Sequence, residues 1–224
     1  MHVFADQANF DAYVSGFLWI LKLTGAAAVL ALLLGVLLAA FRVSPVPVLR
    51  GLGTAWVNIF RNTPLTLIIF FCYFGLFSTL GLSLAEDLDL NNYWLGVVGL
   101  SVYTASFVCE AVRSGINTVP NGQAEAARAI GLTFFQTLRI VVLPQAGRAV
   151  VAPLGSVLIA LCKNATIVGT IGLMESSSVM KDLINSNGDA VIAIFAVFAG
   201  TFAALLIPTG YFFGWLANRL AVKR

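Results

Sequence analysis

Five long apolar runs, separated by polar loops, dominate the pattern of the chain. They occupy 17–41, 56–80, 93–112, 149–171 and 190–216. A helix needs roughly 20 mostly apolar residues to cross the hydrocarbon of a bilayer. The second run is continuously apolar only over Leu65–Leu80, and we expect it to bend at Pro64. The pattern predicts an all-α integral membrane protein with five transmembrane helices, built as a single domain over 1–224.

Composition agrees with a lipid environment. The chain is 59% hydrophobic and only 10% charged, whereas a soluble domain typically carries about 25% charged residues. In lipid the backbone must satisfy its own hydrogen bonds, so helices are the expected form. The first sixteen residues contain Asp6 and Asp11 but no lysine or arginine. That is not the charge of a signal peptide, so we expect the first run to remain as a membrane helix.

Charge alternates from loop to loop. The first loop, the third loop and the C-terminal tail are basic, with Arg42, Arg50 and Arg61, then Arg113, Arg128, Arg139 and Arg148, then Arg219, Lys223 and Arg224. The second and fourth loops are mainly acidic, with Glu86, Asp87 and Asp89, then Glu175, Asp182 and Asp189 against Lys181. Since lysine and arginine mark the cytoplasmic side, we expect the N-terminus outside and the C-terminus inside. Because membrane topology accounts for the bases, the net charge of +3 does not indicate nucleic-acid binding.

The third loop, 113–148, is far longer than a tight turn requires. Pro120, Asn121 and Gly122 form a turn signal. Asn121 is then the expected N-cap of a short helix that has Glu125 in its first turn. Gly131 is expected to end that helix in a left-handed conformation. A second amphipathic stretch should then run to Pro144. The loop is either a hairpin resting in the lipid headgroups or a docking element for a cytoplasmic partner.

Charged and polar residues inside the spans are candidates for function. Lys163 lies within the fourth span, where a charge is costly, so it should face the protein interior or a cavity. It would either meet a substrate carboxylate or pair structurally, with Glu110 or with a helix C-terminus. Asn164 and Thr166 are hydrogen-bonding groups in the same region. Glu110 and Arg113 are expected to form an i, i+3 ion pair.

Enzymatic chemistry has no recognisable motif here. The sequence contains no paired catalytic carboxylates, no HExxH, no nucleophile beside a base and no GxxxxGK[ST] phosphate loop. The three cysteines lack metal or redox spacing and are expected to be buried; they are Cys72, Cys109 and Cys162. We therefore expect no catalytic residue, no metal site and no cofactor. A chain without the phosphate loop cannot hydrolyse ATP by itself.

The third loop also carries a family motif. Glu125-Ala126-Ala127, then Gly131, then the IVVLP ending at Ile140–Pro144 resemble the EAA loop of bacterial ABC importer permeases. Further segments resemble the polar amino acid branch of that family and cover nearly the whole chain. They include RNTPL at Arg61–Leu65, RSGINTV at Arg113–Val119, LPQAGR at Leu143–Arg148 and Lys163–Thr166. Within the branch the sequence is most similar to the glutamate-uptake permeases of actinobacteria.

The resemblance implies partners and roles. A permease of this kind sits in the bacterial cell membrane beside a second permease subunit, here expected to be a different chain. A cytoplasmic ATPase dimer binds below, and an extracytoplasmic amino-acid-binding protein delivers the substrate. The ATPase-coupling residues would be Glu125, Ala126, Ala127 and Gly131, and the substrate path would include Ser156, Lys163, Asn164 and Thr166.

The resemblance also bears on the substrate. Many members for polar or basic amino acids carry N-E-F-x-x-x-x-K-D-T in the fourth span, whereas this chain has Ser156-Val157-Leu158 and Asn164. Both acidic positions are therefore neutral, which favours an acidic amino acid, glutamate first and aspartate second. Glutamine or a basic amino acid stays open as the cargo. An ATP-independent secondary transporter and a membrane-embedded enzyme are the alternative classes.

Overall fold

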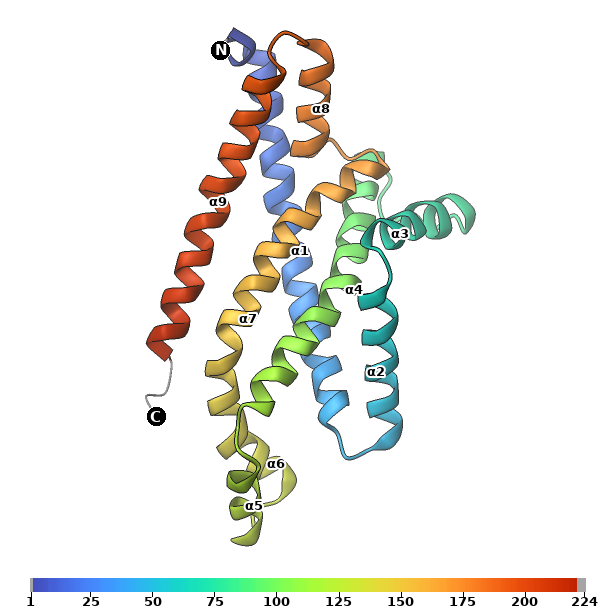
Figure 1. The fold of residues 1–224 in the computed structure, drawn as a ribbon. Helices are drawn as coiled ribbons and strands as arrows, with labels where there is room; N and C mark the ends of the chain where they lie inside the picture. The colour runs from blue at the N-terminus through green and yellow to red at the C-terminus, as the bar shows by residue number, and fades with distance from the viewer. Residues whose placement is uncertain (1, 221–224) are drawn as a thin grey trace.

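Long helices stand side by side along one axis and set the shape of the molecule (Figure 1). The computed structural model describes residues 2–220, and this part of the chain contains helices and no strand. In chain order the elements are η1 (His2–Ala5), α1 (Gln7–Val43), α2 (Pro47–Asn62), α3 (Leu65–Phe70), η2 (Phe71–Thr79), α4 (Leu88–Asn117), α5 (Asn121–Ala129), α6 (Phe134–Thr137), η3 (Leu138–Val142), α7 (Leu143–Asn164), η4 (Ala165–Ile171), α8 (Ser176–Ser186) and α9 (Val191–Leu220). The elements η1 and η4 are 3-10 helices, whereas η2 and η3 are π-helical.

Four helical stretches are long and apolar enough to cross a membrane. They are Gln7–Val43, Leu88–Asn117, Phe134–Ile171 and Val191–Leu220. The second predicted span, 56–80, is broken, because Pro47–Asn62 and Leu65–Thr79 meet at 103°. Thr63 and Pro64 between them have extended backbone, as proline and the residue before it favour. The expected bend is present, but it is so sharp that α3 and η2 point away from the bundle (Figure 1).

The helix α4 is the centre of the bundle. It packs against α1, α2, α3 and α7, and its buried positions run from Asn91 to Gly115. The main core joins it to α1, η2 and η4 through Ile20, Leu23, Leu100, Cys72 and Val168. All three cysteines are buried and free, as expected. A second core cluster, which includes Leu38, Val57 and Ala105, joins α1, α2 and α4 nearer the end that holds the third loop.

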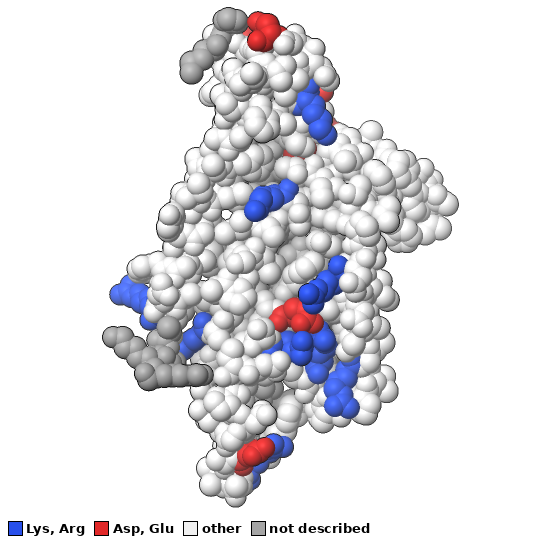
Figure 2. Space-filling model, viewed as in Figure 1, with Lys and Arg blue, Asp and Glu red and all other residues white. Residues whose placement is uncertain are grey.

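The two ends of the bundle differ in charge. The helices α5 and α6 lie at one end, while the start of α1 and the helix α8 lie at the other (Figure 1). Most lysine and arginine side chains visible in Figure 2 gather in the half that contains α5 and α6. The charge pattern placed Arg61 in the first loop, but the structure does not. Arg61 lies in the last turn of α2, about 20 Å along the helix axis from Pro47 at 1.5 Å per residue.

Candidate functional site

The third loop folds into a short helix, a glycine turn and a second helix. Gly131 adopts a φ of +95° after α5, so the left-handed turn expected there is confirmed. The turn is closed by Leu132 N–H donating to the Ala127 carbonyl at 3.1 Å, a helix C-cap pattern. The cap at the start differs from the expectation. Pro120 is the N-cap, Asn121 is the first helical residue, and no side chain caps the helix.

The helix after the glycine turn also differs from the expectation. Thr133 and Gln136 form a capping box at its start. Pro144 does not end the helix, which continues from Phe134 to Ile171. It lies in the first turn of α7, directly after the π-helical turn η3. A proline inside a continuous helix removes one intrahelical hydrogen bond, and here the π-helical turn η3 directly precedes it. The loop is therefore joined to the fourth span as one continuous helix.

An apolar cluster seats α5 against η3, with Ile116 of α4 and Ala146 of α7 in the same cluster. Ala124 of α5 packs beside Val119, Val142 and Ala146, together with Ile116 and Leu138. Ala127 is also buried, whereas Glu125, Ala126 and Gly131 are not. The Gln145 side-chain amide donates to the Gln123 side-chain oxygen at 2.6 Å and links α7 to α5. One face of α5 is thus fixed to the bundle, and the other face presents Glu125 and Ala126 outward.

Large apolar side chains stand exposed around α5 and α6. Ile130 is 81% exposed and Phe135 is 77% exposed, while Phe134 and Ile140 are also exposed. These residues belong to α6 and η3 or directly follow α5, and α5 and α6 lie at one end of the molecule (Figure 1). Apolar groups exposed in this way mark a surface that contacts a protein or a membrane. A contact on this surface is therefore expected whether the loop rests in the lipid headgroups or docks a cytoplasmic partner.

A pocket lies between α4 and α7 and has a volume of about 250 Å³. Its lining residues are Tyr103, Thr104 and Phe107 from α4, and Ser156, Val157, Ala160, Leu161 and Asn164 from α7. Two of the predicted path residues, Ser156 and Asn164, are thus brought to one site. The α4 wall was not predicted, although its residues at 103, 104 and 107 follow helical spacing in an apolar span. No residue of this lining carries a formal charge at neutral pH.

The other two predicted path residues do not line the pocket. Lys163 is exposed in the last turn of α7, and Thr166 is half-buried in η4. The Thr166 hydroxyl donates to the Lys163 carbonyl at 2.8 Å. The pairing of Lys163 with Glu110, one of the alternatives, is wrong. Within residues 2–220, Lys163 forms no ion pair with a carboxylate.

Glu110 instead joins two arginines. It pairs with Arg42 of α1 and, across 3.1 Å, with Arg113 of its own helix. The i, i+3 pair is therefore confirmed, and the contact with Arg42 is an addition that the sequence did not indicate. Glu110 follows Tyr103 by seven residues, close to two helical turns, so both lie on one face of α4 about 10 Å apart along the axis. The cluster has a net positive charge and lies between the pocket and the α5 end.

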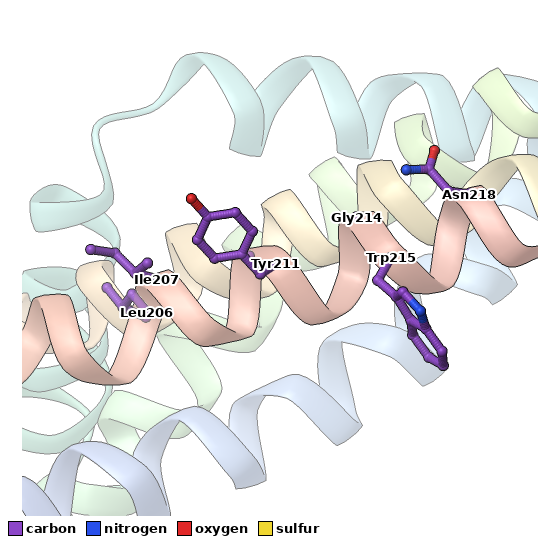
Figure 3. Close-up of a pocket in the computed structure, with 7 residues that line it drawn as sticks. Leu206, Ile207, Tyr211, Gly214, Trp215 and Asn218 are labelled. Atoms are coloured by element: carbon purple, nitrogen blue, oxygen red, sulfur yellow. The ribbon is translucent and has the colours of Figure 1, made fainter.

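A second, larger hollow on the surface does not carry this chemistry. It measures about 660 Å³ and is formed by α9 alone (Figure 3). Leu206, Ile207, Tyr211 and Trp215 supply most of its apolar side chains, with Asn218 as the polar group. A groove on one helix face does not surround a ligand. The pocket between α4 and α7 is therefore the stronger candidate, since two helices form its walls and hydroxyl and amide groups converge there.

Comparison with known proteins gives consistent matches over most of the chain. Residues 31–222 match the family described as binding-protein-dependent transport system inner membrane component. The glutamate transport system permease protein GluC of Corynebacterium glutamicum is 49% identical over 212 residues, covering 92% of this chain and 93% of that protein. The probable glutamine ABC transporter permease protein GlnM of Bacillus subtilis is 36% identical, covering 95% and 94%. A crystal structure of an amino acid ABC transporter with histidines superimposes with a TM-score of 0.85 at 24% identity, over 97% of this chain and 98% of that one, and supports the fold.

Proposed function

The chain belongs to the family of binding-protein-dependent transport system inner membrane components, and we propose that it is the permease subunit of an ATP-driven importer for an acidic amino acid, with glutamate as the first candidate. The observation that carries the proposal is the pairing of two features in one chain. An exposed coupling helix, α5, packs on η3, which continues directly into α7, one of the two helices that enclose the neutral pocket. The other pocket helix, α4, joins the same apolar cluster through Ile116. A movement of the coupling helix α5 would therefore be transmitted to the helices that line the pocket.

Coupling would begin at α5. The ATPase partner would dock on the exposed surface that includes Glu125, Ile130 and Phe135. Ala126 has too little bulk to obstruct close seating, and Gly131 fixes the angle of the helix. Displacement of α5 would pass through the apolar cluster into α4 and α7. The partner supplies ATP hydrolysis, since this chain has no phosphate-binding loop.

The crossing of α4 and α7 gives that motion a pivot. Gly115 of α4 lies directly against the Val150 side chain of α7. A Cβ atom added at Gly115 would also lie only 3.0 Å from the Ala146 carbonyl oxygen. Any side chain at Gly115 would overlap with Val150. The contact lies between the apolar cluster at Val119 and Ala146 and the pocket at Phe107 and Val157. A small rotation about this contact would widen or narrow the pocket.

The pocket chemistry supports an anionic or neutral cargo. Its polar groups are hydroxyls and an amide, and a carboxylate that would repel glutamate is missing from the residues that line it. Lys163 is exposed one residue before Asn164, and it would add a favourable positive charge if the path extends past the pocket mouth. The relatives carry glutamate and glutamine in their names, so glutamine and aspartate are the competing cargoes within this proposal.

The remaining parts of the proposal concern assembly. The basic end with α5 would face the cytoplasm, which places the N-terminus outside and makes the broken pair α2 and α3–η2 the fifth membrane segment. A second permease chain would complete the translocation path, because only α4 and α7 of this chain line the pocket. An extracytoplasmic binding protein would deliver the amino acid to the outer end. The proposal excludes an ATP-independent carrier.

A purification experiment tests this assignment. The tagged chain, isolated from its native membranes in mild detergent, should bring an ATPase and a second permease with it. ATP hydrolysis by that complex should rise when the binding protein and glutamate are added together. Aspartate, glutamine and arginine serve as the comparison panel. Isolation of the chain without an ATPase, or stimulation by arginine and not by acidic amino acids, would contradict the proposal.

A further inference from the structure

An exposed arginine lies outside the site described so far. Arg61 stands in the last turn of α2, and its side chain is exposed. Within the part of the chain that the structure describes, it pairs with no carboxylate. Basic side chains are visible at several heights along the bundle in Figure 2, so its basic end does not account for all of them. The depth of Arg61 in the bundle decides whether it is an anchor at the membrane surface.

The contact between α1 and α2 gives that depth. A Cβ atom added at Gly53 of α2 would lie 3.1 Å from the Leu38 carbonyl oxygen of α1. The two helices run in opposite directions (Figure 1). Arg61 follows Gly53 by eight residues, about 12 Å along the axis, so it lies beside Leu30, which precedes Leu38 by eight residues. Leu30 is close to the middle of the predicted span 17–41.

An arginine at this depth cannot reach the lipid headgroups. Leu30 is about 20 Å along the helix from residue 17 and about 17 Å from residue 41. An extended arginine side chain covers less than half of either distance. A charge within the hydrocarbon is costly, so such residues face a water-filled cavity or a partner group. Arg61 is therefore expected to lie in water or against an anion.

The exposed surface of α2 is divided in the same sense. One side of the helix carries exposed polar residues at helical spacing, which we call the polar flank: Arg50, Thr54, Asn58 and Arg61. The opposite side carries Leu52 and Ile59, which are 58% and 59% exposed. The apolar side suits contact with lipid. The polar flank suits contact with water along the whole length of α2.

Arg61 also lies at the depth of the neutral pocket. The Ser101 hydroxyl of α4 lies 3.4 Å from the Ala27 carbonyl oxygen of α1, and Gly35 of α1 lies directly against Val108 of α4. The stretch of α4 between these two contacts includes its wall of the pocket. The same stretch of α1 includes the position beside Arg61. The arginine and the pocket are therefore level with each other across the bundle.

We propose that the polar flank of α2 borders the water-filled cargo path, and that Arg61 binds the side-chain carboxylate of an acidic amino acid as it passes. This inference rests on the proposed function. The two backbone charges of an amino acid balance each other, so the net charge of glutamate is that of its side chain. The pocket lining carries no charge to offset it. A guanidinium supplies the missing positive charge and two parallel N–H donors that match a carboxylate.

Chemical modification of a cysteine tests both parts of the proposal in one protein. The Arg61→Cys variant of the full complex is treated in open membrane fragments with a methanethiosulfonate that carries either an ammonium or a sulfonate group. Ile59→Cys, on the apolar side of the same helix, is the matched control. The three native cysteines are buried. A thiol in hydrocarbon stays protonated and unreactive, so both reagents should modify the Arg61→Cys variant and neither should modify Ile59→Cys.

Uptake of labelled glutamate is then measured in proteoliposomes that hold the complex, with ATP inside and the binding protein outside. Loss of the positive charge should lower uptake by the unmodified Arg61→Cys variant about 30-fold, the effect of one unit charge across a pocket of this size. The ammonium reagent should restore most of the rate. The sulfonate reagent should lower it further, although it adds similar bulk. Ile59→Cys should match the wild type throughout.

Each other outcome contradicts a named part of the proposal. An unreactive Arg61→Cys variant would show that lipid or the second permease chain covers the position, and equal uptake after the two reagents would show that its charge does not act on the cargo. If Arg61→Cys does not assemble, Arg61→Lys and Arg61→Gln decide the question, because only the lysine should retain uptake. A wild-type complex that takes up no glutamate would contradict the proposed function itself.

Discussion

Carboxylates placed in the pocket between α4 and α7 test whether its neutral lining selects an anionic cargo. The perturbation is the double variant Val157→Glu with Asn164→Asp, at two residues that both line the pocket. Each substitution adds a negative charge to a wall that has none among its lining residues. The expected result is a loss of glutamate uptake with no loss of assembly, because neither residue belongs to the buried core of the bundle.

The magnitude follows from the size of the pocket. A sphere of about 250 Å³ is about 8 Å across, so a bound carboxylate lies within about 8 Å of every wall group. Two unit charges at that separation repel by about 2 kcal/mol at an effective dielectric of 20. One added carboxylate should therefore lower glutamate transport about 30-fold, and two should lower it about 1000-fold. Proton uptake by a desolvated carboxyl reduces the larger figure toward the smaller one.

The assay is ATP-dependent uptake of labelled glutamate by proteoliposomes that hold the full complex and the native binding protein. Val157→Gln is the matched control, because it has the size of glutamate without its charge. We expect the control to keep most of the wild-type rate. Equal uptake by the double variant and the control would refute the electrostatic reasoning, although the family assignment would stand.

Three further predictions concern topology, coupling and stability. A cysteine at Asp87 should react with an impermeant thiol reagent added outside, and one at Arg128 should not, against a low background because the three native cysteines are buried; the reverse labelling would contradict the orientation. Glu125→Arg and Gly131→Pro should each abolish receptor-stimulated ATP hydrolysis while the subunit still inserts, because proline cannot adopt the φ of +95° at Gly131; rates near wild type in both would contradict the role of α5. Glu110→Gln should lower the free energy of unfolding of the complex, because it leaves Arg42 and Arg113 without their carboxylate partner. Loss of a fully buried ion pair costs about 3–5 kcal/mol, and the loss is smaller here because the cluster is partly exposed; an unchanged melting temperature would show that the cluster adds nothing to stability.

The spans could be predicted because lipid imposes a simple rule on the sequence. Length and apolar composition located all five runs, and four of them are single helices. The second run is the exception: its bend at Pro64 was expected, but the angle could not be predicted from composition, since it depends on how α3 packs on α4. Loop boundaries shifted for a related reason. The helix α4 continues to Asn117, beyond the predicted end at 112, because Ile116 and Val119 pack against η3 and α7.

The site was predictable only in part. The left-handed turn at Gly131 was predicted correctly, because a glycine directly after an amphipathic helix commonly ends that helix in this conformation. Ser156 and Asn164 share a pocket, whereas Lys163 and Thr166 lie outside it. Lys163 is the neighbour of Asn164 in α7 and so lies about 100° away around the helix axis, and Thr166 lies beyond α7 in the 3-10 helix η4. Arg42 and Glu175 were not identified as structural partners. The contact of Arg42 with Glu110 joins segments that are far apart in the sequence. Glu175 caps α8 through its next three residues, but the sequence alone did not indicate that this cap is buried.

The central claim is that this chain forms the membrane path of an ATP-driven importer for glutamate. The most direct test is accumulation of labelled glutamate inside proteoliposomes that contain this chain, its permease partner and the ATPase, with ATP inside and the binding protein outside. The account predicts uptake against a concentration gradient that stops when ATP is replaced by a non-hydrolysable analogue and that excess unlabelled glutamate suppresses. Uptake that proceeds equally without ATP hydrolysis, or that excess glutamate leaves unchanged, would contradict it.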